Sequence, residues 1–210
     1  MVPKERVLAA LKRLQPDKVP FMDVVDRKMQ EKIMGRPVFD QLELVEKMSF
    51  DSLMYEAYPP FFVVKEKNES GREIITDGQI HARSDLGKVK MPALDGPFID
   101  EMKRFVDKYA RTGYALYYRT RMGCAGVLNS MGLDNFSYAL VDDPWLVDEL
   151  LRIYSEWTME LLDKTQGLGF DFVWFSDDLS YKSGPMFSPQ VFREVFLPRM
   201  KNVRDHVRLP

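Results

Sequence analysis

Helical and strand-like patterns alternate along most of this chain, and that alternation constrains its fold more than any other feature. The clearest pair is a helix predicted over residues 144–166 and an apolar strand predicted over residues 170–175. Asp143 can cap this helix, Pro144 occupies its first turn, and Gly167 follows its last turn. Parallel strands joined by crossover helices form a parallel sheet, so the sequence predicts an α/β protein.

The same pattern predicts four strand–helix units. Strands are predicted at residues 19–25, 51–56, 114–118 and 170–175, and helices at 3–14, 27–34, 41–48, 98–109, 144–166 and 188–207. Pro198 is expected to kink the last helix, because an internal proline removes a backbone hydrogen bond. Residues 61–91 differ, since two short strand-like runs flank the turn residues 69–72. We interpret that segment as a β-hairpin inserted into the α/β scaffold.

Composition limits the classes of function. The 210 residues include 30 Lys and Arg against 32 Asp and Glu, which argues against a nucleic-acid or membrane partner. The single cysteine, Cys124, cannot form an internal disulfide and indicates a reducing compartment. The amino terminus has no apolar leader, so a cytoplasmic location is expected. Two histidines and one cysteine lie at no ligand-like spacing, so no internal metal site is expected.

Candidate functional residues follow the predicted strands, because chemistry in parallel α/β folds collects at the carboxyl ends of strands. Asp177 and Asp178 directly follow the strand at 170–175. Two adjacent carboxylates there can act as acid or base, bind a cation, or anchor the N–H groups of a ligand. The alternative is that one of them caps a turn and the other faces water.

Two arginines follow the strand at 114–118. Arg119 and Arg121 can bind a carboxylate or phosphate through paired hydrogen bonds. Each is equally typical of a surface arginine paired with Asp or Glu. Cys124 lies close by, but no histidine is near it in sequence, and we interpret it as a small buried residue rather than a nucleophile.

Several segments carry a family resemblance. They are FSDDL at 175–179, GPMFSP at 184–189 and FREVFLPRMK at 192–201, together with KERVLAAL at 4–11 and PDKVP at 16–20. With these segments the chain resembles the uroporphyrinogen decarboxylase superfamily over most of its length. The resemblance implies a (β/α)8 TIM barrel, of which residues 1–210 form a single incomplete domain with about the first four β/α units. Truncation is the favoured explanation, and a half-barrel that dimerises or a split enzyme are the alternatives.

The superfamily has two main activities, and this sequence departs from one of them. One branch decarboxylates uroporphyrinogen to coproporphyrinogen without a cofactor, and the other moves methyl groups between a corrinoid protein and an acceptor such as coenzyme M or a folate. The R-Q-A-G-R-Y motif of the decarboxylases has no arginine counterpart in FMDVVD at 21–26. Without those arginines the carboxylates of a polyanionic substrate would be unpaired. A corrinoid-dependent methyltransferase is therefore expected, with uroporphyrinogen decarboxylase and a non-catalytic accessory half-barrel as alternatives.

The resemblance also implies roles for individual residues and partners. The expected catalytic residues are Asp177 and Asp178, the expected anion contacts are Arg119 and Arg121, and the expected pocket residues are Glu56, Tyr58 and Asn129. No metal ligand is expected within this chain. A methyltransferase would use a corrinoid on a partner protein, with zinc ligands from the second half of the barrel, whereas a decarboxylase would need no cofactor. The expected small-molecule partner is a tetrapyrrole or a methyl acceptor, and a second copy of the chain is a further candidate.

Overall fold

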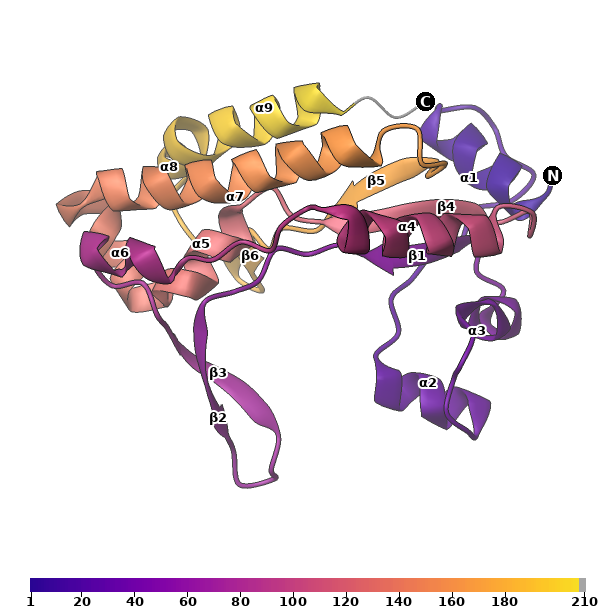
Figure 1. The fold of residues 1–210 in the computed structure, drawn as a ribbon, viewed down its shortest axis with the longest axis horizontal. Helices are drawn as coiled ribbons and strands as arrows, with labels where there is room; N and C mark the ends of the chain where they lie inside the picture. Colours follow the sequence, from indigo (N-terminus) through magenta and orange to yellow (C-terminus); the bar gives the residue numbers. More distant parts are fainter. Residues whose placement is uncertain (208–210) are drawn as a thin grey trace.

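The computed structural model describes residues 1–207, and a parallel sheet of three strands lies at its centre (Figure 1). The strands β1 (Ser52–Glu56), β4 (Ala115–Thr120) and β5 (Phe172–Phe175) lie in the order β1-β4-β5. Tyr117 is opposite Met54 on one side and Phe172 on the other. The predicted α/β architecture with a parallel sheet is confirmed. Closure into a (β/α)8 barrel remains a prediction, because it needs more strands than these three.

The helices match most of the predicted segments. They are α1 (Pro3–Leu11), α2 (Arg27–Met34), α3 (Gln41–Met48), α4 (Gly96–Tyr109), α5 (Cys124–Met131), α6 (Leu133–Asp142), α7 (Pro144–Thr165), α8 (Pro189–Val191) and α9 (Leu197–His206), with a 3₁₀ helix, η1, at Arg83–Lys88. A short antiparallel pair, β6 (Ser180–Tyr181) and β7 (Gly184–Pro185), follows the sheet. No helix among residues 1–207 is both long and apolar enough to cross a membrane.

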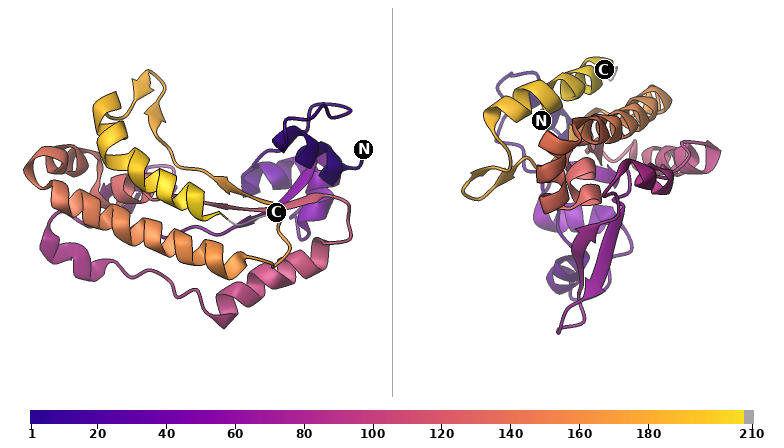
Figure 2. Two further views of the ribbon diagram at one scale, coloured as in Figure 1. Left: turned by 90° about the horizontal axis from the view of Figure 1, so that it is seen from above. Right: turned by 90° about the vertical axis from the view of Figure 1, so that its left-hand side faces the viewer.

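Helix α7 is the longest helix among residues 1–207 and contributes side chains to the core on one face of the sheet. The Asp143 carboxylate accepts a hydrogen bond from the Leu146 N–H at 3.3 Å, as the capping prediction requires. α7 lies along α9, and both cover one face of the sheet together with α4 (Figure 2). Each large apolar side chain buried in this layer contributes about 1.5–3 kcal/mol. The buried members from the strands and α7 are Leu53, Leu116, Tyr118, Trp157, Leu161 and Leu162.

The predicted strand at residues 19–25 is wrong. Next to β1, the backbone of this segment is hydrogen-bonded only to Asp51. The Asp51 N–H donates to the Phe21 carbonyl at 2.7 Å, and the Asp51 carboxylate accepts from the Phe21 N–H at 2.8 Å. Farther along the edge, the Gln41 side-chain amide takes the place of a strand. Its Nε2 donates to the Met54 carbonyl at 2.9 Å, and its Oε1 accepts from the Met54 N–H at 2.7 Å. Side chains therefore satisfy the edge where the sequence predicted a fourth strand.

The predicted hairpin is confirmed. Strands β2 (Val63–Lys67) and β3 (Glu73–Gly78) pair antiparallel and project away from the sheet (Figure 1). A buried hydroxyl network fixes the base of the hairpin. Ser130 Oγ accepts from the Phe62 N–H at 3.0 Å and lies 2.8 Å from the Tyr154 hydroxyl, which donates to the Pro60 carbonyl at 2.8 Å. The hairpin therefore leaves the domain from a rigid base.

The helix predicted over residues 188–207 is interrupted just before Pro198. A π-helical turn, η2 (Phe192–Phe196), joins α8 to α9, and Pro198 lies in the first turn of α9. Proline has no N–H to donate to the carbonyl four residues earlier, so the regular α-helical ladder cannot run through this position.

Candidate functional site

The candidate site lies where the three parallel strands end. β1 runs into the loop that carries Tyr58, β4 into the loop that carries Arg121, and β5 into the segment that carries Asp177. Carboxyl ends of parallel strands meet at one edge of a sheet, so residues far apart in the sequence come together here.

Two arginines stack on the same aromatic ring. The Arg121 guanidinium carbon lies 3.8 Å from the centre of the Tyr58 ring, and that of Arg119 lies 5.1 Å from it. Arg121 also lies 4.6 Å from the Phe61 ring, and Arg119 lies 5.9 Å from the Trp174 ring. Stacking on rings holds a guanidinium plane in place while its N–H groups stay free for a ligand. The structure thus brings Arg119, Arg121 and Tyr58 together, and their predicted roles in ligand binding remain predictions.

Neither arginine has a carboxylate partner among residues 1–207. The Arg119 Nε is buried without a hydrogen-bond partner. Burial lowers the pKa of Arg121, the charge of Arg119 lowers it further, and the charge of Asp177 opposes both effects. Two neighbouring cations with unfilled donors are costly in the absence of an anion. The arrangement is therefore not that of two surface ion pairs, and anion binding by these two arginines remains a prediction.

Ser176 ties the end of β5 to this cluster. Its Oγ and the Tyr58 hydroxyl lie 3.1 Å apart and share a hydrogen bond, and its N–H donates to the Thr120 carbonyl at 2.9 Å. Sequence reasoning selected the residues that follow the strand at 170–175 but assigned no role to Ser176. A serine directly after an apolar strand was the available signal, and the residue now fixes the ring on which both arginines lie.

Asp177 caps a helix of the neighbouring unit. Its carboxylate accepts hydrogen bonds from the Met122 N–H and, at 2.8 Å, from the Ala125 N–H at the start of α5. Desolvation raises the pKa of Asp177, while these N–H donors and the Arg121 charge oppose the rise. The carboxylate thereby holds the β4–α5 loop, which includes Arg121. Positioning of this loop is a role that sequence reasoning did not foresee.

The remaining predicted site residues differ in their surroundings. Asp178 is exposed and makes no hydrogen bond within the described part of the chain. The Asn129 amide donates to the Ala125 carbonyl of its own helix at 2.7 Å. Glu56 is exposed at the end of β1, directly opposite Arg119 in the sheet register. Catalytic roles for Asp177 and Asp178 remain predictions. Cys124 is buried, and burial raises the pKa of its thiol far above the usual range, which agrees with a packing role.

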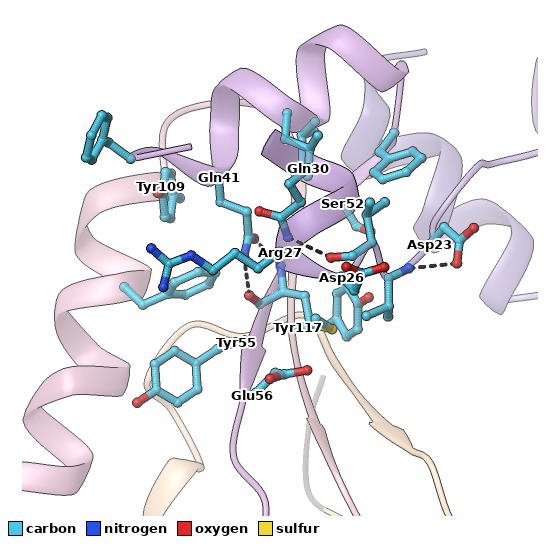
Figure 3. A pocket seen from close by; sticks show the side chains of 18 residues that line it. Asp23, Asp26, Arg27, Gln30, Gln41, Ser52, Tyr55, Glu56, Tyr109 and Tyr117 are labelled. Atoms are coloured by element: carbon cyan, nitrogen blue, oxygen red, sulfur yellow. Dashed lines mark hydrogen bonds between the residues drawn. The ribbon is translucent and has the colours of Figure 1, made fainter. Parts of the chain in front are cut away.

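A cavity beside β1 was missed by sequence reasoning (Figure 3). It measures about 840 Å³ and lies between the edge of β1 and residues 23–45. Ser52, Met54, Tyr55 and Glu56 line it from β1, Tyr117 lines it from β4, and Phe105 and Tyr109 line it from α4. Consecutive residues of β1 point to opposite faces, so the cavity reaches both faces of the sheet at the edge of β1, and no period-two pattern could have indicated it. Burial, with smaller effects of nearby carboxylates, raises the pKa of Tyr117 to about 12.

The histidines take no part in this site. His81 lies 3.3 Å from an Asp77 oxygen, and His206 lies 2.8 Å from an Asp163 oxygen. Residues 1–207 contain no group of three or more His, Cys, Asp or Glu side chains placed to hold a metal ion.

A solved structure shares this fold. It is a methyltransferase from Methanosarcina mazei, which aligns with 100% of this chain and 68% of its own at a TM-score of 0.69. The sequences are 17% identical, so the likeness concerns the fold alone. No protein-family model matches the chain. No curated protein matches its sequence either.

Proposed function

We propose that this chain belongs to a corrinoid-dependent methyltransferase of the uroporphyrinogen decarboxylase superfamily. Such an enzyme moves a methyl group to or from a corrinoid held on a partner protein. The observation that carries the proposal is the unpaired Arg119–Arg121 cluster at the strand ends of a fold that a methyltransferase shares. The sequence segments at 175–201 support the choice of superfamily.

The residues of this chain would bind and orient the methyl acceptor or donor. Arg119 and Arg121 hold its anionic group, and stacking on the Tyr58 ring fixes the orientation of both guanidinium groups. Asp177 fixes the loop that presents Arg121, and the exposed Asp178 carboxylate is free to exchange a proton with the ligand. The described residues provide no three-ligand set for zinc, so we assign them no zinc-dependent step. The corrinoid, when bound to its partner protein, supplies the cobalt that carries the methyl group.

The test is methyl transfer by the full chain. The protein is incubated with methylcobalamin and a thiol or folate acceptor, and the absorbance spectrum of the corrinoid is followed. We expect demethylation, and we expect Arg121→Gln to lower kcat/KM by about 10–100-fold, the loss of one charge-assisted contact. Arg152→Gln is the matched control, because Arg152 binds Glu149 and Glu156 on the surface of α7 and should leave kcat/KM unchanged.

Two results would contradict the proposal. Conversion of uroporphyrinogen to coproporphyrinogen without demethylation of methylcobalamin would identify a decarboxylase. Binding of a corrinoid protein with no methyl transfer to any acceptor would identify an accessory protein.

A further inference from the structure

The Arg121 guanidinium lies against two aromatic rings of one short segment. This segment, residues 58–62, follows β1 and reads YPPFF. The Arg121 guanidinium carbon lies 3.8 Å from the centre of the Tyr58 ring and 4.6 Å from the centre of the Phe61 ring. Stacking on a ring orients a guanidinium plane, so the path of residues 58–62 decides how Arg121 is presented.

A chain of hydrogen bonds through two hydroxyl groups holds that segment. The Tyr154 hydroxyl donates its only proton to the Pro60 carbonyl at 2.8 Å. The proton between Tyr154 and Ser130, whose oxygens lie 2.8 Å apart, therefore comes from Ser130. Ser130 Oγ in turn accepts from the Phe62 N–H at 3.0 Å. The two backbone groups fixed in this way lie on either side of Phe61 in the sequence.

The two hydroxyl groups are buried in a tightly packed place. Tyr154 and Ser130 are both 0% exposed. A Cβ atom at Gly126 would lie 2.5 Å from the Tyr154 ring, so α5 passes against this ring at a position that has no room for a side chain. Burial raises the pKa of Tyr154, so the phenol keeps the proton that it donates.

Helix α7 also holds the backbone of Arg121. Thr158 lies one turn after Tyr154 on the same face of α7, and it is 0% exposed. Its hydroxyl donates to the Arg121 carbonyl at 2.7 Å. One face of α7 therefore contacts both the backbone of Arg121 and the segment whose rings meet its guanidinium.

We propose that Tyr154 is a positioning residue for Arg121. Through the Pro60 carbonyl and Ser130 it holds the Phe61 ring in the place that orients the Arg121 guanidinium toward an anionic ligand. Tyr154 is itself fully buried, so it acts through Phe61 and Arg121 and touches no ligand. The inference rests on the proposed function only in that it concerns the same arginine pair, and it involves no chemical step.

Proton NMR on the full chain measures the placement of the guanidinium. Protons held against the face of an aromatic ring resonate upfield, and those of the Arg121 side chain are identified by their loss in Arg121→Gln. We expect the Arg121 Cδ protons upfield of those of Arg152, which lies in ion pairs with Glu149 and Glu156. Tyr154→Phe should move the Arg121 protons toward the position of the Arg152 protons.

Tyr118→Phe is the matched control. Tyr118 is also 0% exposed, and its hydroxyl lies 2.9 Å from that of Thr165 in the packed core. Tyr118→Phe and Tyr154→Phe each remove one buried hydroxyl, so both should lower the Tm by about 2–6 °C. Only Tyr154→Phe should move the Arg121 protons.

A second pair of variants tests the same hydrogen bonds from their other end, and it also serves if Tyr154→Phe does not fold. Ser130→Ala removes the acceptor of the Phe62 N–H and should move the Arg121 protons as well. Ser155→Ala is its control, since Ser155 is 2% exposed and its hydroxyl donates to a carbonyl of its own helix at 3.1 Å. Ser155→Ala should leave the Arg121 protons in place.

Titration with inorganic phosphate, followed by the same Arg121 protons, measures what the placement does for ligand binding. We expect Tyr154→Phe to weaken phosphate binding by about 3–10-fold, because the guanidinium is no longer held in one orientation. Tyr118→Phe should leave the affinity for phosphate unchanged.

Unmoved Arg121 protons in both Tyr154→Phe and Ser130→Ala would overturn the proposal, and so would equal movement in Tyr118→Phe. Equal affinity of the native and Tyr154→Phe proteins for phosphate, or no binding by either, would overturn it as well. These measurements need no corrinoid. Absence of methyl transfer therefore removes only the proposed function, and unmoved Arg121 protons remove only this inference.

Discussion

The two faces of the central sheet are built from the same three strands and differ most toward the carboxyl ends of those strands. On the face covered by α4, α7 and α9, Leu53, Leu116 and Tyr118 are at most 2% exposed. On the other face, Glu56 is exposed, Arg119 is half-buried and Trp174 is 36% exposed. The first face is a packed core throughout, whereas the second is buried at Ala115 and Tyr117 and has charges without partners only toward the carboxyl ends of the strands. Alternate residues at those strand ends therefore lie in different surroundings.

The largest expected effect tests the packed face. Leu53→Ala should lower the free energy of unfolding by about 2–5 kcal/mol, because it leaves a cavity in a core that cannot collapse around it. Met54→Ala, one residue later on the open face, should cost less than half as much, since Met54 is only partly buried. Urea unfolding followed by circular dichroism measures both. Equal losses would show that the two faces are packed alike.

Substitutions of Asp177 and of Asp178 should differ in their effect on the free energy of unfolding. Asp177→Asn replaces one accepting oxygen by an N–H₂ group that faces a backbone donor, and it should cost about 1–2 kcal/mol. Asp178→Asn makes the same chemical change at an exposed residue and should alter the free energy of unfolding by less than about 0.5 kcal/mol. Thermal unfolding of both variants at one pH is the measurement. If Asp178→Asn were the more damaging, the capping role of Asp177 would be wrong.

Substitution of an arginine in the Arg119–Arg121 cluster should change the free energy of unfolding in the opposite direction. Arg121→Gln removes a partly buried charge that has a cation beside it and no carboxylate partner, so it should leave the free energy of unfolding unchanged or raise it by up to about 1 kcal/mol. Affinity for a carboxylate ligand should fall in the same variant. Denaturant unfolding and ligand titration are made on one preparation. A destabilised Arg121→Gln protein would mean that the arginine serves the fold rather than a ligand.

The smallest expected effect is on the pH dependence of stability, which should differ between Asp177 in the candidate site and Asp85 outside it. Asp85 binds Lys88 at 2.8 Å and accepts from the His81 N–H at 2.9 Å, and these contacts lower the pKa of Asp85 to about 2. Its contribution to stability is present above the unfolded pKa of about 4 and is lost as the pH falls toward 2. Desolvation acts on Asp177 in the opposite direction and raises its pKa.

Because the pKa of Asp177 is raised in the folded state, its contribution to stability is present below the unfolded pKa of about 4. That contribution is lost as the pH rises from there through the folded pKa. Carbon-detected NMR titration of the two carboxyl groups measures both directions. Titration of Asp177 below Asp85 would contradict the environments described for them.

Local signals in the sequence determined most of the regular elements. The capping Asp143 and Pro144 set the start of α7, and the turn between residues 67 and 73 set the hairpin. These features depend on neighbours a few residues apart, so they can be read without tertiary contacts. The strand-end rule also selected Arg119 and Arg121 as anion contacts and Tyr58 as a pocket residue, and the structure places these three side chains together.

Tertiary structure decided the rest, because it determines which side chains and backbone groups distant in the sequence form hydrogen bonds with one another. Residues 19–25 read as a strand, but the Gln41 amide and the Asp51 carboxylate satisfy the edge of β1 instead. The sequence left Asp177 open as an acid, a base or the cap of a turn, whereas in the structure backbone N–H groups some fifty residues earlier occupy its oxygens. Long-range hydrogen bonds of this kind leave no periodic trace in the sequence. The sequence by itself therefore determined the α/β pattern and the candidate residues, and only the folded chain determined which of them keep their charge available for a ligand.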